Sequence, residues 1–188
     1  MAGILVTGIA DQPTISAMRR PRCFHNDIEQ DRIQELRVKR FTRANRWEGK
    51  VRNNKLQLKW FIETYSNDIP RAETRTTVNQ TFQLWSDQLR VPSVHNVGLN
   101  VTEAADASEA DINLKFANGD HGDEYPFDGA GGMINILAHT FSPKFREGGS
   151  LNGDIHFDDH ETWSLNAVLP KSSVNLRSVL VHEIGMTF

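Results

Sequence analysis

Three histidines and one aspartate lie in separate glycine- and aspartate-rich segments of this sequence and have the chemistry of a metal site. His121 and Asp123 are two residues apart, so an extended turn can place the imidazole and the carboxylate on one side. His139 and His156 each lie in a short alternating stretch that predicts a strand. Four such ligands close a tetrahedral zinc shell and leave no position for water. The pattern predicts a structural zinc site; the alternative is a solvated loop rich in Asp and His.

The carboxylates around these histidines indicate a second kind of metal. Calcium prefers about six to eight oxygen ligands, and glycines let backbone carbonyls turn inward. The candidate ligands for one calcium ion are Asp128, Gly129, Gly131, Asp158, Asp159 and Glu161, and those for another are Asp111 and Asp154. Without a cation the neighbouring carboxylates would repel one another. The alternative is an acidic solvated turn, since most carboxylates in proteins are exposed.

The last eight residues contain His182 and Glu183 in the order found in a zinc-peptidase helix. Histidines four residues apart share a helix face and can bind one zinc ion, with the glutamate as general base. Position 186 is Met, whose neutral thioether is a poor zinc ligand beside imidazole. Because one imidazole does not fix a catalytic zinc, we expect a polypeptide of these 188 residues to be inactive as a peptidase.

Hydrophobic periodicity predicts the elements that must carry these residues. Alternating apolar residues indicate strands, and apolar residues at spacings of three and four indicate amphipathic helices. The predicted strands cover residues 55–64, 97–101 and 111–116, and the predicted helices cover 74–89 and 175–186. The stretch between 117 and 161 needs bound metal to become ordered, because burial in a core does not offset the conformational entropy that so long a loop loses. The expected fold class is α+β.

Length and composition describe one globular domain. The chain has 188 residues, 38% of them hydrophobic and 24% charged, and a net charge of −3 that gives no basic face for nucleic acid. It has one cysteine, and no apolar run long enough to span a membrane. The start, MAGILVTGIAD, lacks the basic region of a signal peptide. Glycosylation acceptors at Asn79 and Asn100 fit a secreted chain.

The segments GDHGDEYPFDGAGG, LAHTF, GDIHFDDHETW and HEIG occur in this order and resemble the metal-binding core of a matrixin, the catalytic domain of matrix metalloproteinases. The resemblance runs from about Phe41 to the end. It implies a metzincin-like fold, a mixed twisted sheet with two helices, of which the second, active-site helix is truncated. It also implies that the zinc and calcium positions named above match the family's sites, with His182 as the first catalytic-zinc ligand and Glu183 as the general base.

Residues 1–40 resemble a shortened matrixin propeptide. Family propeptides carry Pro-Arg-Cys-Gly-x-Pro-Asp, whose thiolate binds the catalytic zinc and keeps the enzyme latent; this chain has PRCFHND around Cys23. Phe24 replaces a glycine at a position where the backbone needs freedom, which predicts a weakened latch. The RVKR sequence that ends at Arg40 resembles a furin-type cleavage site. Cleavage there would leave residues 41–188 as the catalytic domain.

The resemblance implies a secreted zinc metalloendopeptidase that acts on extracellular-matrix or other extracellular proteins. Its cofactors would be zinc and calcium, and a furin-like protease would process it. The alternative is a non-catalytic extracellular binding module or isoform ordered by zinc and calcium. A sequence that continues past Met186 into further histidines favours the enzyme, and a stop at Phe188 favours the module.

Overall fold

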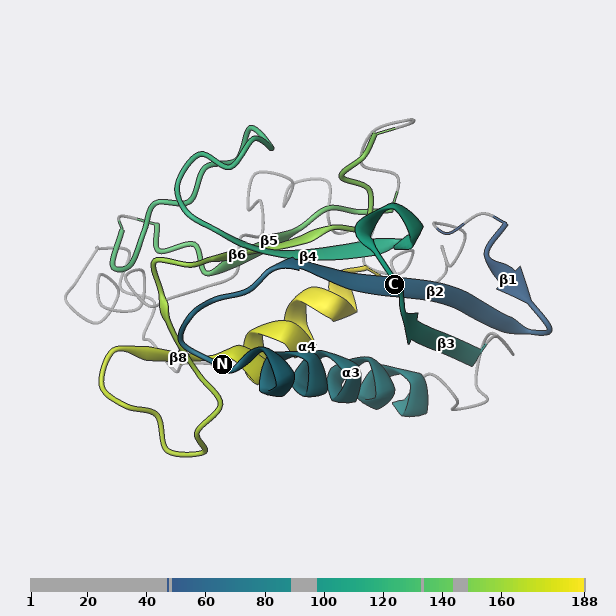
Figure 1. Ribbon diagram of the computed structural model, residues 1–188, viewed down its shortest axis with the longest axis horizontal. Helices are drawn as coiled ribbons and strands as arrows, with labels where there is room; N and C mark the ends of the chain where they lie inside the picture. Colours follow the sequence, from purple (N-terminus) through teal and green to yellow (C-terminus); the bar gives the residue numbers. More distant parts are fainter. Residues whose placement is uncertain (1–46, 48, 89–97, 133, 144–148, 188) are drawn as a thin grey trace, which may run out of the picture.

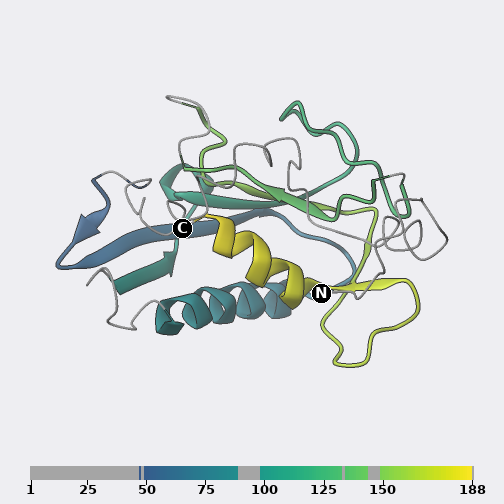
Figure 2. The ribbon, with the colours of Figure 1, turned by 180° about the vertical axis from the view of Figure 1, so that it is seen from behind.

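The computed structural model describes residue 47 and residues 49–88, 98–132, 134–143 and 149–187. A sheet lies over two helices, α3 (Arg71–Gln88) and α4 (Leu176–Met186), as Figure 1 shows. The view from behind in Figure 2 shows that α4 crosses α3 on the same face of the sheet. The glycine-rich segment that follows β4 runs on the opposite side of the sheet (Figure 1). The predicted α+β class is therefore confirmed, with a mixed sheet and two helices.

The main sheet is mixed and has the strand order β1-β2-β4-β6-β5, with β3 paired to β2. Strands β2, β3, β4 and β6 run parallel, whereas β1 and β5 are antiparallel to their neighbours. Strands β7 and β8 form a separate parallel pair. The bounds are β1 (Val51–Arg52), β2 (Lys55–Thr64), β3 (Gly98–Glu103), β4 (Ile112–Ala117), β5 (Ala138–Thr140), β6 (Ile155–Asp158), β7 (Thr162–Ser164) and β8 (Ser173–Asn175), with a 3-10 helix η2 (Ala107–Glu109) before β4.

Alternating apolar residues of the central strands build the core between the sheet and the helices. Strand β2 has the predicted bounds and buries Leu58, Trp60 and Ile62 on one face. The apolar residues of β4, which begins one residue later than predicted, are buried in the same alternating way. Because successive strand residues point to opposite faces, the other face of these strands is free to carry polar groups.

Helix α3 begins three residues before the predicted start at Thr74. The carbonyl of Pro70 accepts bonds from the amides of Glu73 and Thr74, so the first turn follows directly on the proline. Thr77 is inside the helix, and its hydroxyl donates to the Glu73 carbonyl four residues back. Threonine at this place is therefore a helical residue rather than an N-cap. The predicted apolar stripe is confirmed at Phe82, which packs against the core.

Helix α4 is fixed at its start and along its length. Asn175 caps it, because its side chain accepts a bond from the Ser178 amide. Farther along, the Trp85 indole of α3 donates to the Val181 carbonyl at 3.0 Å. Gly185 allows this close approach, since a Cβ at that position would lie 2.5 Å from Trp85 Cζ2. The contact between the helices sets the position of α4, which carries His182 and Glu183.

We expect Gly185→Ala to destabilise the domain. An added methyl group that collides with a rigid indole costs about 1–3 kcal/mol, and alanine's better helix propensity returns at most about 1 kcal/mol of this. Urea unfolding should therefore show a lower free energy of unfolding. Gly98→Ala is the matched control, because its Cβ would lie 3.5 Å from the nearest atom, an ordinary contact, and should change little. Equal stability of both variants would contradict the packing described above.

Several sequence predictions fall outside the described residues. These are the propeptide assignment of residues 1–40, the latch cysteine Cys23 and the cleavage site at Arg40. Within the described ranges, no helix combines the length and the apolar character needed to cross a bilayer.

Candidate metal centre

Two of the predicted zinc ligands are brought together by strand pairing. Strands β5 and β6 are antiparallel, and their register places His139 directly opposite His156. Directly opposed residues in an antiparallel pair project from the same face, with Cβ atoms about 4.5–5.5 Å apart. The two ring centroids lie 5.3 Å apart. The pairing thus presents two imidazoles to the loop that crosses this face.

A tight turn supplies the other two ligands. Gly122 separates His121 from Asp123 and has a φ of 90°, a conformation that glycine adopts without steric cost. His121 and Asp123 consequently point in the same direction, toward the strand pair. The Phe127 ring stacks on His121 with a centroid distance of 4.6 Å and on His139 at 4.7 Å. This ring helps to shield the four donors from solvent.

The four side chains converge on one point. Asp123 Oδ2 lies 2.6 Å from His121 Nε2, 2.7 Å from His139 Nε2 and 2.7 Å from His156 Nδ1. One donor atom from each residue lies within 4.8 Å of the others, and all four side chains are almost fully buried. Ligands of a tetrahedral zinc ion lie about 3.3 Å apart at bond lengths near 2.0–2.1 Å. These residues, called the His/Asp cluster below, have spacings that fit such an ion after a small adjustment.

The charge states of the His/Asp cluster also suit a cation. Burial opposes ionisation of Asp123, but the Tyr125 amide and two histidine rings donate to its carboxylate and lower its pKa to about 2. Burial lowers the pKa of His156 to about 4 and also lowers that of His139. Near neutral pH these groups are therefore an ionised carboxylate and neutral imidazoles, which are the protonation states that metal ligands require.

His121 gives a further indication of metal binding. Its Nδ1 lies 2.8 Å from the Gly119 carbonyl, while its Nε2 lies 2.6 Å from Asp123 Oδ2. The bond to the carbonyl needs a proton on Nδ1, which leaves the lone pair of Nε2 beside the Asp123 carboxylate. A metal ion would bind that lone pair while Nδ1–H donates to the carbonyl and orients the ring, as in many metal sites. The chemistry of the donor set therefore fits zinc.

The first predicted set of calcium ligands lies in two neighbouring segments, one around Asp128 and one from Asp158, the last residue of β6, to Glu161. The Asp128 carboxylate accepts bonds from three amides of its own loop, those of residues 134, 135 and 136. Gly129 has a φ of 77°, and its amide donates to Asp158 Oδ2 at 3.1 Å. Gly131 has a φ of 70°. The two segments are thus linked through Gly129.

Two buried oxygen atoms in this region lack partners within the described part of the chain, Asp159 Oδ1 and Glu161 Oε1. Burial raises the pKa of Asp158, and burial together with the charges of Asp158 and Asp128 raises that of Glu161. Hard, mutually repelling oxygens fit a calcium ion chemically. Only the His/Asp cluster, however, brings three or more His, Cys, Asp or Glu donors within 4.8 Å of one another in the described ranges.

The second predicted calcium pair has other contacts. Asp111 forms an ion pair with Lys50, and its second oxygen accepts the Lys59 amide at 2.9 Å. Asp154 is buried and accepts the Asn113 amide at 3.1 Å, and burial raises its pKa to about 7. Asp111 is therefore paired with Lys50, and Asp154 with the Asn113 amide.

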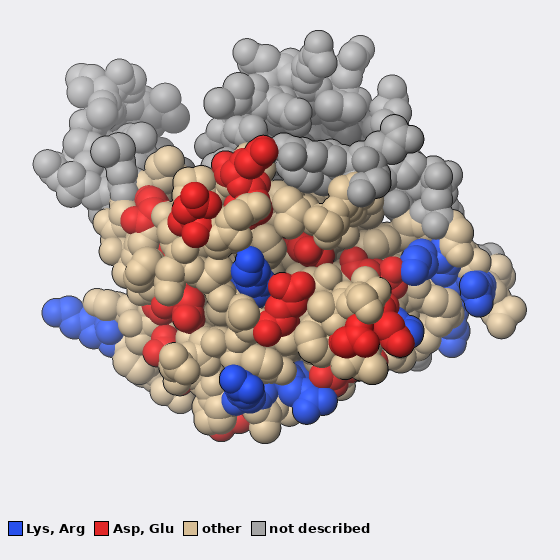
Figure 3. All heavy atoms as spheres, turned by 45° about the horizontal axis from the view of Figure 1, so that its top comes forward, with Lys and Arg blue, Asp and Glu red and all other residues tan. Residues whose placement is uncertain are grey.

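Acidic side chains lie in several groups over the surface seen from the loop side of the sheet (Figure 3). His182 and Glu183 lie on the opposite side, on α4. His182 is exposed, whereas Glu183 is only 2% exposed, and its Oε2 accepts a bond from the Thr140 hydroxyl at 2.6 Å. His182 belongs to none of the donor groups found within the described residues. Sequence reasoning missed Thr140, although its place directly after His139 on a strand is a usable signal.

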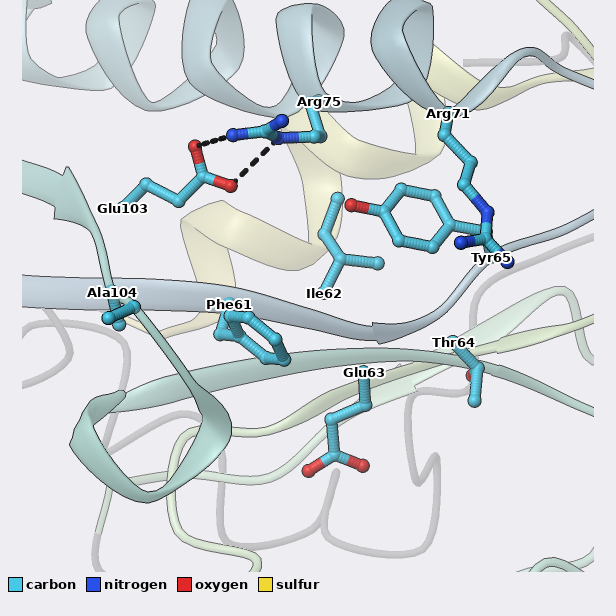
Figure 4. Close-up of a pocket in the computed structure, with 10 residues that line it drawn as sticks. Phe61, Ile62, Glu63, Thr64, Tyr65, Arg71, Arg75, Glu103 and Ala104 are labelled. Atoms are coloured by element: carbon cyan, nitrogen blue, oxygen red, sulfur yellow. Dashed lines mark hydrogen bonds and ion pairs between the residues drawn. The ribbon is translucent and has the colours of Figure 1, made fainter.

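A pocket of about 870 Å³ lies elsewhere, between the end of β2, the start of α3 and the residues after β3 (Figure 4). Arg75 forms a two-bond ion pair with Glu103, with both distances 2.9 Å. The Arg71 guanidinium lies 5.1 Å above the centre of the Tyr65 ring. No residue predicted to bind metal or to catalyse lines this pocket.

Comparison with known proteins finds relatives in one family. The matrixin family model matches residues 46–188. Matrix metalloproteinase-B of Caenorhabditis elegans is 43% identical over 190 residues, covering 95% of this chain and 36% of the relative. Interstitial collagenase of Equus caballus is 36% identical over 183 residues, covering 97% and 32%. Macrophage metalloelastase of Rattus norvegicus is 37% identical over 185 residues, also covering 97% and 32%.

These matches define the family of the protein. The chain belongs to the matrixin family, as its motifs predicted. It spans about a third of the length of these relatives, 32–36%.

Proposed function

We propose that this chain is part of a secreted zinc-dependent metalloendopeptidase that cleaves extracellular-matrix or other extracellular proteins. The His/Asp cluster carries the proposal, because four buried donors of the kinds that bind zinc lie in a domain of the matrixin family. Glu183 supports it, since a general base must be held near the reaction and this carboxylate is buried on α4. The names of the relatives, a collagenase and a metalloelastase among them, are consistent with protein substrates.

The proposed roles differ between the two sides of the sheet. The His/Asp cluster holds a structural zinc ion that ties the long loop to β5 and β6. On α4, His182 is the first ligand of a catalytic zinc ion and Glu183 is the general base. Such an ion, when bound, makes a water molecule acidic enough to act as a nucleophile near neutral pH. Among the described residues the donors do not fit this second ion, because α4 offers one imidazole and has Met186 four residues later.

Peptide hydrolysis tests the proposed function. Protein made from the complete transcript should cleave a quenched fluorescent peptide and lose this activity with a zinc chelator. A polypeptide of residues 1–188 should not cleave it even with added zinc, because His182 alone does not hold the ion. Turnover by residues 1–188 that is lost on chelation would contradict the role given to α4.

The second candidate is a non-catalytic extracellular module ordered by zinc and calcium. Met186 favours it, because a thioether stands where an active zinc helix needs its next imidazole. A complete transcript that supplies no further histidines, together with full zinc binding and no hydrolysis, would decide for the module.

Calcium should stabilise the domain. Burial, together with repulsion from Asp158 and Asp128, raises the pKa of Glu161, and an ion bound by these carboxylates would offset both effects. With zinc held constant, we expect millimolar calcium to raise the melting temperature by several degrees, at about 2–4 °C per kcal/mol for a chain of this size, and magnesium to do less. Glu161→Gln should reduce the response, and Glu73→Gln, at an exposed site on α3, should not. A melting temperature that does not change when calcium is added would argue against these residues as calcium ligands.

We also propose that residues 1–40 act as a propeptide, with Cys23 as a weakened latch and cleavage after Arg40. The support is the order of the PRC and RVKR sequences ahead of the matched domain. Incubation with a furin-type protease should yield a chain that begins at Phe41, as read by N-terminal sequencing. Arg40→Ala should block this product. Cleavage at another position would contradict the assignment.

A further inference from the structure

Strand β5 connects the two sides of the candidate site through adjacent residues. It has only three residues, and its second residue, His139, belongs to the His/Asp cluster on the loop side of the sheet. Thr140 follows and points to the other face, because strand side chains alternate. Its hydroxyl lies 2.6 Å from Glu183 Oε2 and 3.3 Å from the Glu183 carbonyl oxygen. Thr140 therefore contacts α4 at the residue proposed as the base.

The contact constrains one oxygen of the carboxylate and leaves the other free. A hydroxyl that donates to a carboxylate at about 2.5–2.7 Å makes a strong, charge-assisted bond. Glu183 Oε1 is buried and has no hydrogen-bond partner within the described residues. Among the described residues, the Thr140 hydroxyl is therefore the group that fixes the orientation of this carboxylate.

We propose that Thr140 is a positioning residue, whose hydroxyl fixes the orientation of the Glu183 carboxylate. This rests on the proposed function for the role of Glu183 as base, but the contact itself does not depend on it. Threonine suits the task because its branched Cβ restricts χ1. Valine has the same shape without a hydroxyl, and serine keeps the hydroxyl without the branch. The two substitutions therefore separate the hydrogen bond from packing.

Carbon NMR of the zinc-loaded chain tests the proposal. Glutamate is labelled at the side-chain carboxyl carbon, and the Glu183 signal is assigned by its loss in Glu183→Gln. Thr140→Val should shift this signal by more than its linewidth, and Thr140→Ser should restore it. Thr64→Val is the matched control, because the Thr64 hydroxyl donates to the Phe116 carbonyl at 2.7 Å, at the end of β2. It should leave the Glu183 signal unchanged.

A Glu183 signal that is the same in Thr140→Val and in the parent chain would overturn the proposal. So would a signal in Thr140→Ser that stays at the valine position. If Thr140→Val does not fold, measurements on the parent chain test the proposal. Three-bond couplings from the Thr140 methyl carbon to its backbone nitrogen and carbonyl carbon should then report one χ1 rotamer, and averaged couplings would refute a fixed hydroxyl. None of these NMR experiments measures peptide cleavage. A protein without peptidase activity would therefore refute the proposed function without affecting these results.

Discussion

Replacing Asp123 with alanine should abolish tight zinc binding and lower the free energy of unfolding of the zinc-loaded chain by more than about 3 kcal/mol. Asp123 Oδ2 is the atom on which the three imidazoles converge, at 2.6–2.7 Å. Without the carboxylate, a buried ion would lose its only negative ligand in the His/Asp cluster. The loss should appear as a melting temperature lower by roughly 6–12 °C, measured by calorimetry with and without zinc.

Asp120→Ala is the matched control for this variant. Asp120 is exposed, lies in the same loop, and accepts one bond from the Gly122 amide at 3.2 Å. Its removal should leave zinc content unchanged and cost less than about 1 kcal/mol. If Asp123→Ala and Asp120→Ala bind zinc equally well, the cluster is a hydrogen-bonded group and not a metal site.

Glu183→Gln should reduce kcat/KM for peptide hydrolysis about 10²–10⁴-fold in protein made from the complete transcript. Glutamine keeps the shape of the side chain and can still accept a bond from the Thr140 hydroxyl, but it cannot take up a proton. Kinetics with a fluorescent peptide measure the effect, and metal analysis should show the zinc content unchanged.

The conservative control for the glutamate variant is Glu73→Gln, on the exposed part of α3, which should keep full activity. Activity within about threefold of the parent in Glu183→Gln would remove Glu183 from the role of base, whatever the zinc content.

Local pattern predicted the strands well and singled out the four side chains that form the His/Asp cluster, because these depend on short segments. The alternation in Lys55–Thr64 gave the bounds of β2, and its buried face is the predicted one. The spacing of His121 and Asp123, and the alternation around His139 and His156, placed the four donors on elements that the structure brings together. The motif order was specific enough to indicate the family, which the comparison confirms.

Long-range pairing was not predictable in the same way. No sequence pattern near His139 or His156 predicts that β5 and β6 lie side by side and antiparallel. In the same way, no local pattern predicts that β3 and β4 flank β2. The apolar spacing gave too late a start for α3, since the carbonyl of Pro70 opens the helix and the Thr77 hydroxyl bonds back along it. The contact between Thr140 and Glu183 joins residues 43 positions apart, so it required the fold.

The most direct test of the structural zinc site is metal analysis of the folded 188-residue chain after long dialysis against metal-free buffer. We expect about one tightly held zinc ion per chain, lost in both Asp123→Ala and His156→Ala. A folded sample that retains well under one equivalent, on the order of a tenth, would contradict the assignment of His121, Asp123, His139 and His156 as its ligands.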